Sequence, residues 1–97
     1  MLDKKDKYRL RALANPLNPL VIIGKDGLTA NIISSINDAI RVHELIKISV
    51  LKTYVGLPLK ELAMLVCNTI EAEYIFSVGR VFVIYKKNND INAYGIK

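Results

Sequence analysis

Two glycines separated by two residues form the part of the sequence best suited to holding a ligand. Gly24 and Gly27 enclose Lys25 and Asp26, directly after an apolar run and shortly before Thr29. Glycine adopts backbone angles that are closed to other residues, so the pair predicts a tight turn. A helix that begins after Thr29 would present unpaired backbone N–H groups and the positive end of its dipole to this turn. That arrangement suits a phosphate group, and Lys25 at the tip adds a positive charge.

The same four residues also have a plainer interpretation. Glycines at the junction of a strand and a helix often serve only the turn, and the carboxylate of Asp26 is unfavourable beside a phosphate. Aspartate also tolerates tight-turn geometry and can point away from a ligand. The G-x-x-G pattern by itself therefore leaves both a phosphate grip and a simple turn open.

Basic side chains in other segments offer further contacts to a polyanion. Lysines and arginines crowd the N-terminal segment, where a solvated helix face is the alternative explanation, and others follow the apolar run at 81–85. The predicted contact residues are Gly24, Lys25, Asp26, Gly27 and Thr29 in the turn, Lys4, Lys5, Lys7, Arg9 and Arg11 in the N-terminal segment, and Arg80, Lys86 and Lys87 near the C-terminus.

The overall charge agrees with a polyanionic partner. The chain has 97 residues and a formal net charge of +5, from 14 lysines and arginines against 9 aspartates and glutamates. Such an excess favours nucleic acid first and an acidic membrane surface second. No apolar run approaches the length of roughly 18 residues that a membrane span needs, and no secretion signal is evident. A cytoplasmic protein without membrane contact is therefore expected.

Candidate catalytic and metal-binding residues are few. Cys67 and His43 are the chain's single cysteine and histidine, and they lie far apart in the sequence. A zinc site usually takes four such ligands, so no metal site and no cofactor are expected. Cys67 falls on an apolar stripe, which is typical of a small core residue. Neither a nucleotide P-loop nor a G-x-S-x-G elbow is present, and we expect no enzymatic activity.

Periodicity places these residues on seven elements. Apolar residues at helical spacing alternate with short β-branched runs, and Pro16 and Pro58 mark a helix end and a helix start. Gly79 and Arg80 have the length of a hairpin turn. The predicted helices span 3–14, 30–43 and a segment beginning at 58, and the predicted strands span 20–23, 46–51, 72–78 and 81–85.

This order, αβαβαββ, predicts the fold class. Strands separated by helices imply crossover connections, and the last two strands imply an antiparallel hairpin. The expected result is a mixed four-stranded sheet with three helices in a two-layer α/β sandwich. Residues 1–87 are expected to form a single domain, and residues 88–97 a polar C-terminal tail.

Among the aromatic residues, Tyr54 in a predicted loop is a better candidate for base stacking than those of the hairpin.

Several stretches together resemble a known family. They are Arg11–Leu17, Val21–Thr29, His43–Ile48 and Val78–Lys86. In this order and spacing the chain resembles the CRM domain (chloroplast RNA splicing and ribosome maturation), in its free-standing bacterial YhbY-like form. The resemblance extends from about Lys4 to Lys87. It implies a fold similar to the C-terminal domain of translation initiation factor 3 and an RNA contact at the glycine loop.

The resemblance also implies a function. Family members bind RNA, and the bacterial single-domain forms look like factors associated with precursors of the large ribosomal subunit. The expected protein is therefore a monomeric ribosome assembly factor that contacts the backbone of ribosomal RNA through its G-x-x-G loop and basic surface. The alternative is a protein-interaction module whose basic face binds an acidic protein partner. If Lys25, Arg80 and the N-terminal lysines do not share one face, the RNA-binding interpretation loses much of its physical support.

Overall fold

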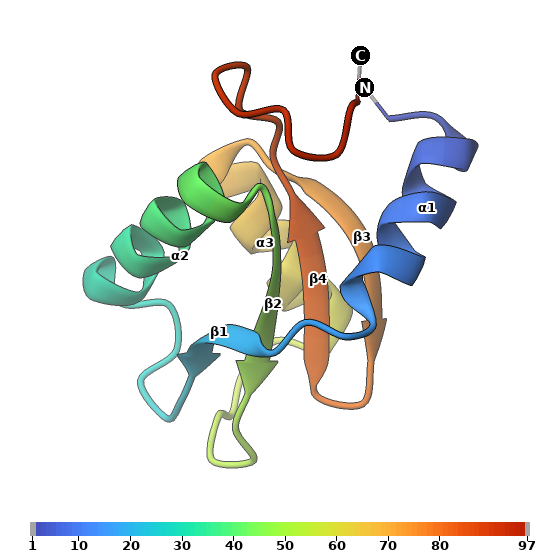
Figure 1. Ribbon diagram of the computed structural model, residues 1–97. Helices are drawn as coiled ribbons and strands as arrows, with labels where there is room; N and C mark the ends of the chain where they lie inside the picture. Colours follow the sequence, from blue (N-terminus) through green and yellow to red (C-terminus); the bar gives the residue numbers. More distant parts are fainter. Residues whose placement is uncertain (1, 97) are drawn as a thin grey trace.

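Seven elements build the structure in the predicted order. The computed structural model describes residues 2–96 of the chain. The helices are α1 (Lys4–Ala14), α2 (Ala30–His43) and α3 (Leu59–Ile70), and the strands are β1 (Pro19–Ile23), β2 (Leu45–Val50), β3 (Glu73–Val78) and β4 (Val81–Tyr85) (Figure 1). Local chemistry explains the first boundary, because the side chain of Asp3 accepts a hydrogen bond from the N–H of Asp6 and caps α1.

The strands form one mixed sheet in the order β1-β2-β4-β3. β1 and β2 are parallel, so α2 must carry the chain across between them, whereas β4 is antiparallel to both β2 and β3. The predicted mixed four-stranded sheet is confirmed. Because Ser49 at the end of β2 pairs with Val81 at the start of β4, the β3–β4 hairpin lies where β2 ends.

This topology gives the sheet two different ends. The β1–α2 loop (24–29), the β2–α3 loop (51–58) and the β3–β4 turn (79–80) gather at one of them, which we call the loop end (Figure 1). At the opposite end, which we call the tail end, α2 and α3 finish and the chain leaves β4 as a tail of residues 86–96.

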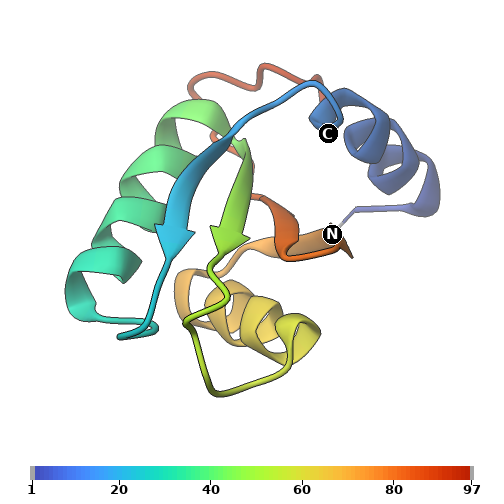
Figure 2. The same cartoon turned by 90° about the horizontal axis from the view of Figure 1, so that it is seen from below.

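α2 and α3 cover one face of the sheet (Figure 2). Ile48 and Phe82 lie at the centre of this core and are fully buried, together with Ile36 of α2 and Leu62 of α3. Burial of such side chains contributes about 1.5–3 kcal/mol each. This core fixes where α2 begins, and α2 in turn fixes the glycine loop before it.

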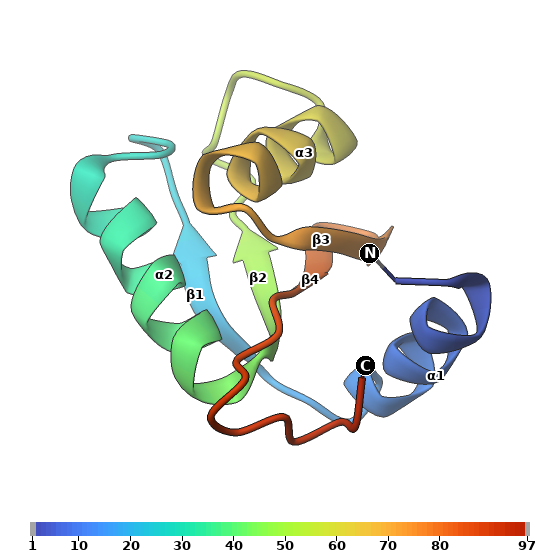
Figure 3. The same cartoon turned by 90° about the horizontal axis from the view of Figure 1, so that it is seen from above.

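α1 packs on the other face, so the helices occupy both sides of the sheet (Figures 2 and 3). Leu10 and Ala14 contact a second cluster that contains Val83 and Tyr85 of β4. The expected two-layer sandwich therefore gains a third, partial layer. The reason is that β4 is apolar along its whole length, and a strand that is apolar on both faces needs cover on both. α1 packs mainly on β2 and β3, and Leu20 and Ile22 of β1 stay about half exposed.

The tail packs against the domain through a buried carboxylate. Glu44 follows α2 with a φ of +63° and is fully buried. Its two carboxylate oxygens accept the N–H groups of Asn88 at 2.8 Å and Ala93 at 2.6 Å. Ile96 is buried in the α1-side cluster, and the ring of Tyr94 stands edge-on to Tyr85. The segment expected to be a polar tail thus adds apolar side chains to the core; residue 97 lies outside the described residues.

Candidate nucleic-acid interface

The G-x-x-G segment forms a closed turn at the loop end. The N–H of Gly27 donates to the carbonyl oxygen of Gly24 at 3.0 Å, which leaves Lys25 and Asp26 at the exposed tip. Gly27 has a φ of +68°, a conformation that L side chains rarely adopt. The pattern therefore serves the turn, and the turn presents the Lys25 ammonium group and the Asp26 carboxylate to solvent.

Thr29 joins this turn to α2. Its hydroxyl oxygen accepts the N–H of Ile32 at 3.1 Å, so it is the N-cap that the sequence predicts. The cap uses one of the unpaired N–H groups of the first turn, and those of Ala30 and Asn31 face out of the helix end. No acidic side chain occupies the first turn of α2 to offset its positive dipole end. The start of α2 thus has the N–H donors and the field that suit an anion, and Lys25 lies in the turn just before it.

Tyr54 connects the glycine loop to the neighbouring β2–α3 loop. A Cβ atom at Gly27 would lie 3.3 Å from a ring carbon of Tyr54, so the ring packs directly against the turn. The Tyr54 hydroxyl accepts the N–H of Leu57 at 3.0 Å, and a Cβ at Gly56 would come within 2.6 Å of that oxygen. Tyr54 is half-buried between two glycines. Tyr54 thus has a structural role between the two loops, besides the stacking contact considered from the sequence.

The hairpin brings Arg80 to the same end. Its backbone oxygen accepts the N–H of Val50 at 2.7 Å, while its side chain is exposed. Between Arg80 and Tyr54 lies a hollow of about 500 Å³. Tyr54 lines this hollow and also packs against the glycine turn, so Arg80 and Lys25 both lie at the loop end. Exposed Lys52, in the loop between them, belongs to the same end.

The basic residues of α1 belong to another face. Lys4, Lys5 and Lys7 are exposed on the side of the sheet opposite α2 and α3 (Figure 3). Two arginines of α1 have partners within the protein. Arg9 donates to the backbone oxygen of Tyr94, and the Arg11 guanidinium lies 4.8 Å from the ring centre of Phe76. The N-terminal lysines therefore do not share a face with Lys25 and Arg80, and the RNA-binding interpretation loses that part of its expected support.

Lys86 and Lys87 lie at the tail end. The ammonium group of Lys86 donates to the backbone oxygen of Ile70 at 2.7 Å and so satisfies a carbonyl in the last turn of α3. The predicted contact residues thus fall into three groups. Gly24, Lys25, Asp26, Gly27, Thr29 and Arg80 meet at the loop end, Lys4, Lys5, Lys7, Arg9 and Arg11 lie on α1, and Lys86 and Lys87 lie at the tail end.

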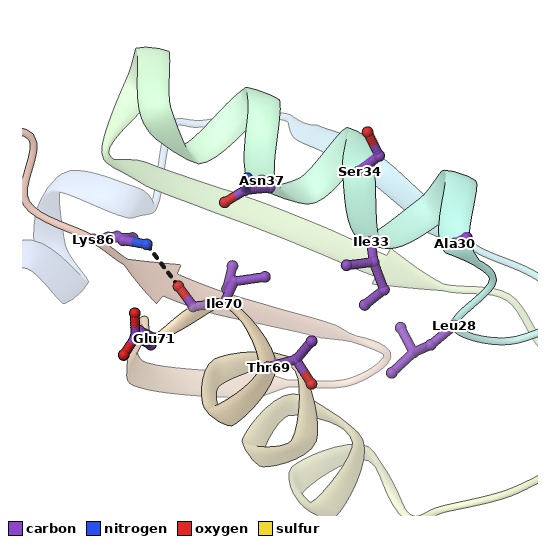
Figure 4. A pocket seen from close by; sticks show the side chains of 9 residues that line it. All are labelled: Leu28, Ala30, Ile33, Ser34, Asn37, Thr69, Ile70, Glu71 and Lys86. Carbon is purple, nitrogen blue, oxygen red and sulfur yellow. Dashed lines mark hydrogen bonds between the residues drawn. The ribbon is translucent and has the colours of Figure 1, made fainter.

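A second hollow runs between α2 and α3 (Figure 4). It has a volume of about 510 Å³, and Leu28, Ile33 and Ile70 supply its apolar side chains. Thr69 and Glu71, at the C-terminal end of α3, line the side of the hollow opposite α2. The hydrogen bond between Lys86 and Ile70 also lies at this end of α3. The hollow contains neither a histidine nor a cysteine that could act as a nucleophile or a base.

Cys67 and His43 are the two residues that the sequence analysis considered for catalysis or metal binding. Cys67 is buried in the core, and burial, reinforced by the nearby Glu73 carboxylate, raises the pKa of its thiol to about 12. A thiol that holds its proton so firmly is a poor nucleophile at neutral pH. His43 is exposed at the end of α2. Within residues 2–96, no cluster of histidine, cysteine and acidic side chains could hold a metal ion. In the same range no helix is both long and apolar enough to cross a bilayer.

The surroundings of two residues, Glu44 and Tyr8, were not predicted from the sequence. The sequence did not indicate that Glu44 is buried or what it binds, because its partners Asn88 and Ala93 are far away in the sequence. Tyr8 gave a usable signal, because helical spacing places it opposite Leu10. Leu10 is fully buried, and 79% of the Tyr8 side chain is exposed among the lysines of α1.

Comparison with known proteins places this fold in a family. A relative from Haemophilus influenzae named as an RNA-binding protein is 32% identical, over 92% of this chain and 89% of its own. The probable RNA-binding protein YqeI of Bacillus subtilis is 31% identical, with 93% of each chain aligned. A solution structure from Staphylococcus aureus superposes with a TM-score of 0.78 at 36% identity and covers 92% of each chain. The model of the CRS1/YhbY (CRM) domain matches residues 2–86. This chain therefore belongs to the CRS1/YhbY (CRM) domain family.

Proposed function

We propose that this protein binds RNA and grips its sugar-phosphate backbone at the loop end. Phosphates would lie at the N-terminus of α2, behind the turn formed by Gly24 and Gly27. Lys25 and Arg80 would add charge from the two sides of that surface. Such contacts position a nucleic acid without reading its sequence.

The observation that carries the proposal is the convergence at the loop end. The glycine turn, the capped helix start and exposed Lys25 come from the β1–α2 loop, Tyr54 comes from the β2–α3 loop, and exposed Arg80 comes from the β3–β4 turn. Tyr54 packs against the turn and so holds two of these connections in a fixed relation. Family membership and the names of the relatives from H. influenzae and B. subtilis support RNA as the polyanion.

The proposal extends to a role in ribosome assembly. The resemblance to the bacterial single-domain forms favours a monomeric, cytoplasmic factor for the large ribosomal subunit. Its action would be passive, since backbone contacts select a structured ribosomal RNA by shape more than by base sequence. Asp26 would point away from the phosphates, as an aspartate at a turn tip can.

The test is binding to ribosomal RNA across a salt series. The parent chain should lose affinity steeply as salt rises, because bound phosphates release counterions. The double variant Lys25→Ala with Arg80→Ala should bind more weakly, with a salt slope shallower by about two contacts. Fluorescence anisotropy of labelled ribosomal RNA fragments would measure both quantities.

A double variant with the same loss of charge provides the control. Arg41→Ala with Lys87→Ala removes two exposed cations near the tail end, and it should keep most of the parent's affinity and slope. Equal losses in both variants would mean that net charge, and not the loop end, determines binding. If the parent binds no better than an unrelated basic protein, RNA is the wrong partner and an acidic protein becomes the leading alternative.

A further inference from the structure

Tyr8 is an aromatic residue that the fold itself does not use. Its side chain is 79% exposed on the outer side of α1, whereas Leu10 and Ala14 on the inner side are fully buried. It belongs to neither of the two core clusters. An exposed tyrosine ring on a small domain offers a flat apolar surface with a polar tip, the form that a base-stacking contact needs.

Cations lie on both sides of this ring. Lys4 and Lys5 precede Tyr8 by four and three residues and Arg11 follows it by three, which is the spacing of neighbours on a helix surface. All three are exposed, and Tyr8 lines a hollow of about 550 Å³ with Lys5 and Arg11. The Arg11 guanidinium is held over the ring of Phe76, so its position is restrained before any ligand arrives.

We propose that Tyr8 is a stacking platform for an unpaired RNA base, with Lys4, Lys5 and Arg11 contacting the phosphates on either side. The inference rests on the proposed RNA binding and specifies it. The RNA must offer an unpaired nucleotide to α1 in addition to the backbone that the loop end grips. Duplex RNA keeps its bases stacked on one another, so it cannot use the ring.

The charge of the surface selects this occupant. A second copy of the chain would bring the same cluster of cations against it, and like charges oppose such contact. A nucleotide supplies both a ring to cover Tyr8 and negative charge for the flanking side chains. Cation contacts alone would not require an aromatic residue at the centre of the cluster.

The sharpest test uses the fact that the chain contains no tryptophan. Tyr8→Trp introduces a single tryptophan, whose fluorescence should be quenched when a base stacks on it. Titration with oligoadenylate about 12 nucleotides long, within the usual site size for single strands, should quench strongly. A duplex RNA of the same length should leave the signal nearly unchanged, even where it binds at the loop end.

Affinity provides an independent measurement. Tyr8→Ala should weaken oligoadenylate binding about tenfold, in the lower part of the range for one stacked base, and Tyr8→Phe should retain the affinity. Because neither change alters charge, the salt slope should stay that of the parent. Val42→Ala, another exposed apolar position on a helix, is the matched control and should have no effect.

The outcomes separate this inference from the proposal beneath it. If the parent binds RNA but Tyr8→Ala binds oligoadenylate equally well, the stacking role is wrong while backbone recognition at the loop end stands. If the parent binds neither oligoadenylate nor the duplex RNA, the proposed function itself fails. If sedimentation shows a parent dimer that Tyr8→Ala dissociates, the surface serves a second copy and the inference is overturned.

Discussion

The two ends of the sheet use charged side chains in opposite ways. At the tail end, the Glu44 carboxylate accepts two backbone N–H groups from the tail, and the Lys86 ammonium group satisfies a carbonyl of α3. At the loop end, Lys25 and Arg80 are exposed, and an aromatic residue, Tyr54, holds the loops together. Glu44 and Lys86 at the tail end thus have partners within the domain, whereas Lys25 and Arg80 at the loop end are exposed to solvent.

This difference teaches that charge alone does not identify a binding surface. Lys25 and Lys86 are the same residue type, and both were expected to contact RNA. The ammonium group of Lys86 donates to a carbonyl of the domain, whereas the Lys25 side chain is exposed at the tip of a turn. Substitutions at one end at a time can show whether stability and RNA affinity respond separately.

The largest effect on stability is expected at the tail end. Glu44→Ala removes the acceptor of two N–H groups and leaves Asn88 and Ala93 without it. Hydrogen bonds to a charged group contribute about 1.5–3 kcal/mol, so we expect the free energy of unfolding to fall by about 3 kcal/mol. Urea denaturation followed by circular dichroism measures this loss. The folded fraction should keep its RNA affinity, because the loop end is untouched.

Glu44→Gln is the conservative control. The amide retains one acceptor oxygen, but its NH2 group only donates and cannot accept the second N–H, so it should lose about 2 kcal/mol, less than the alanine variant. If Glu44→Ala unfolds at the parent's urea midpoint, the buried carboxylate does not hold the tail and the contrast between the ends disappears.

At the loop end, Tyr54→Ala should affect both properties. The half-buried ring packs against Gly27, and its hydroxyl accepts the N–H of Leu57. Full truncation of a buried aromatic residue costs about 3–5 kcal/mol, and for a half-buried one we expect about 2 kcal/mol. RNA affinity should also fall although no charge is lost, because the loops are no longer held in place. Unchanged affinity in anisotropy titrations would show that Tyr54 does not position the interface.

A smaller effect separates the two glycines of the turn. Gly27→Ala places a side chain at a φ of +68° and 3.3 Å from the Tyr54 ring, so we expect a loss of about 1.5 kcal/mol. Gly24→Ala meets only an ordinary contact of 3.5 Å with Leu51 and should be close to neutral. Thermal denaturation of the two variants gives the comparison. Equal losses would mean that the turn does not depend on the conformation of Gly27.

Local patterns in the sequence explain why much of the fold was predictable. The apolar stripe of α2, the alternation in β2 and the turn at Gly79 each depend on residues close together in the chain, and every element lies where its own pattern indicates. The N-cap role of Thr29 is equally local, because its partner Ile32 is three residues away. The same local signals predicted the glycine turn and the helix start that form the proposed RNA interface.

What could not be predicted depends on distant partners. Arg9 donates to Tyr94 and Lys86 to Ile70, so their side chains are engaged by segments that no local pattern connects to them. The third layer escaped prediction for a related reason. The apolar run of β4 indicates burial on both faces, but only the packed structure shows that α1 supplies the second cover.

The smallest predicted effect is a loss of stability at alkaline pH, which arises from Cys67 in the core next to the tail end. Burial raises the pKa of Cys67 from 9.0 to about 12, so the folded chain holds the thiol proton more firmly than the unfolded chain does. Above pH 9.0 the unfolded state therefore binds fewer protons, and the free energy of unfolding falls as pH rises through this window. We expect urea denaturation to show about 1 kcal/mol less stability from this group at about pH 10 than at about pH 7. Cys67→Ala should remove that part of the loss. A parent and a variant that lose stability equally would place the alkaline sensitivity elsewhere, with Tyr85, whose pKa burial also raises, as the next residue to test.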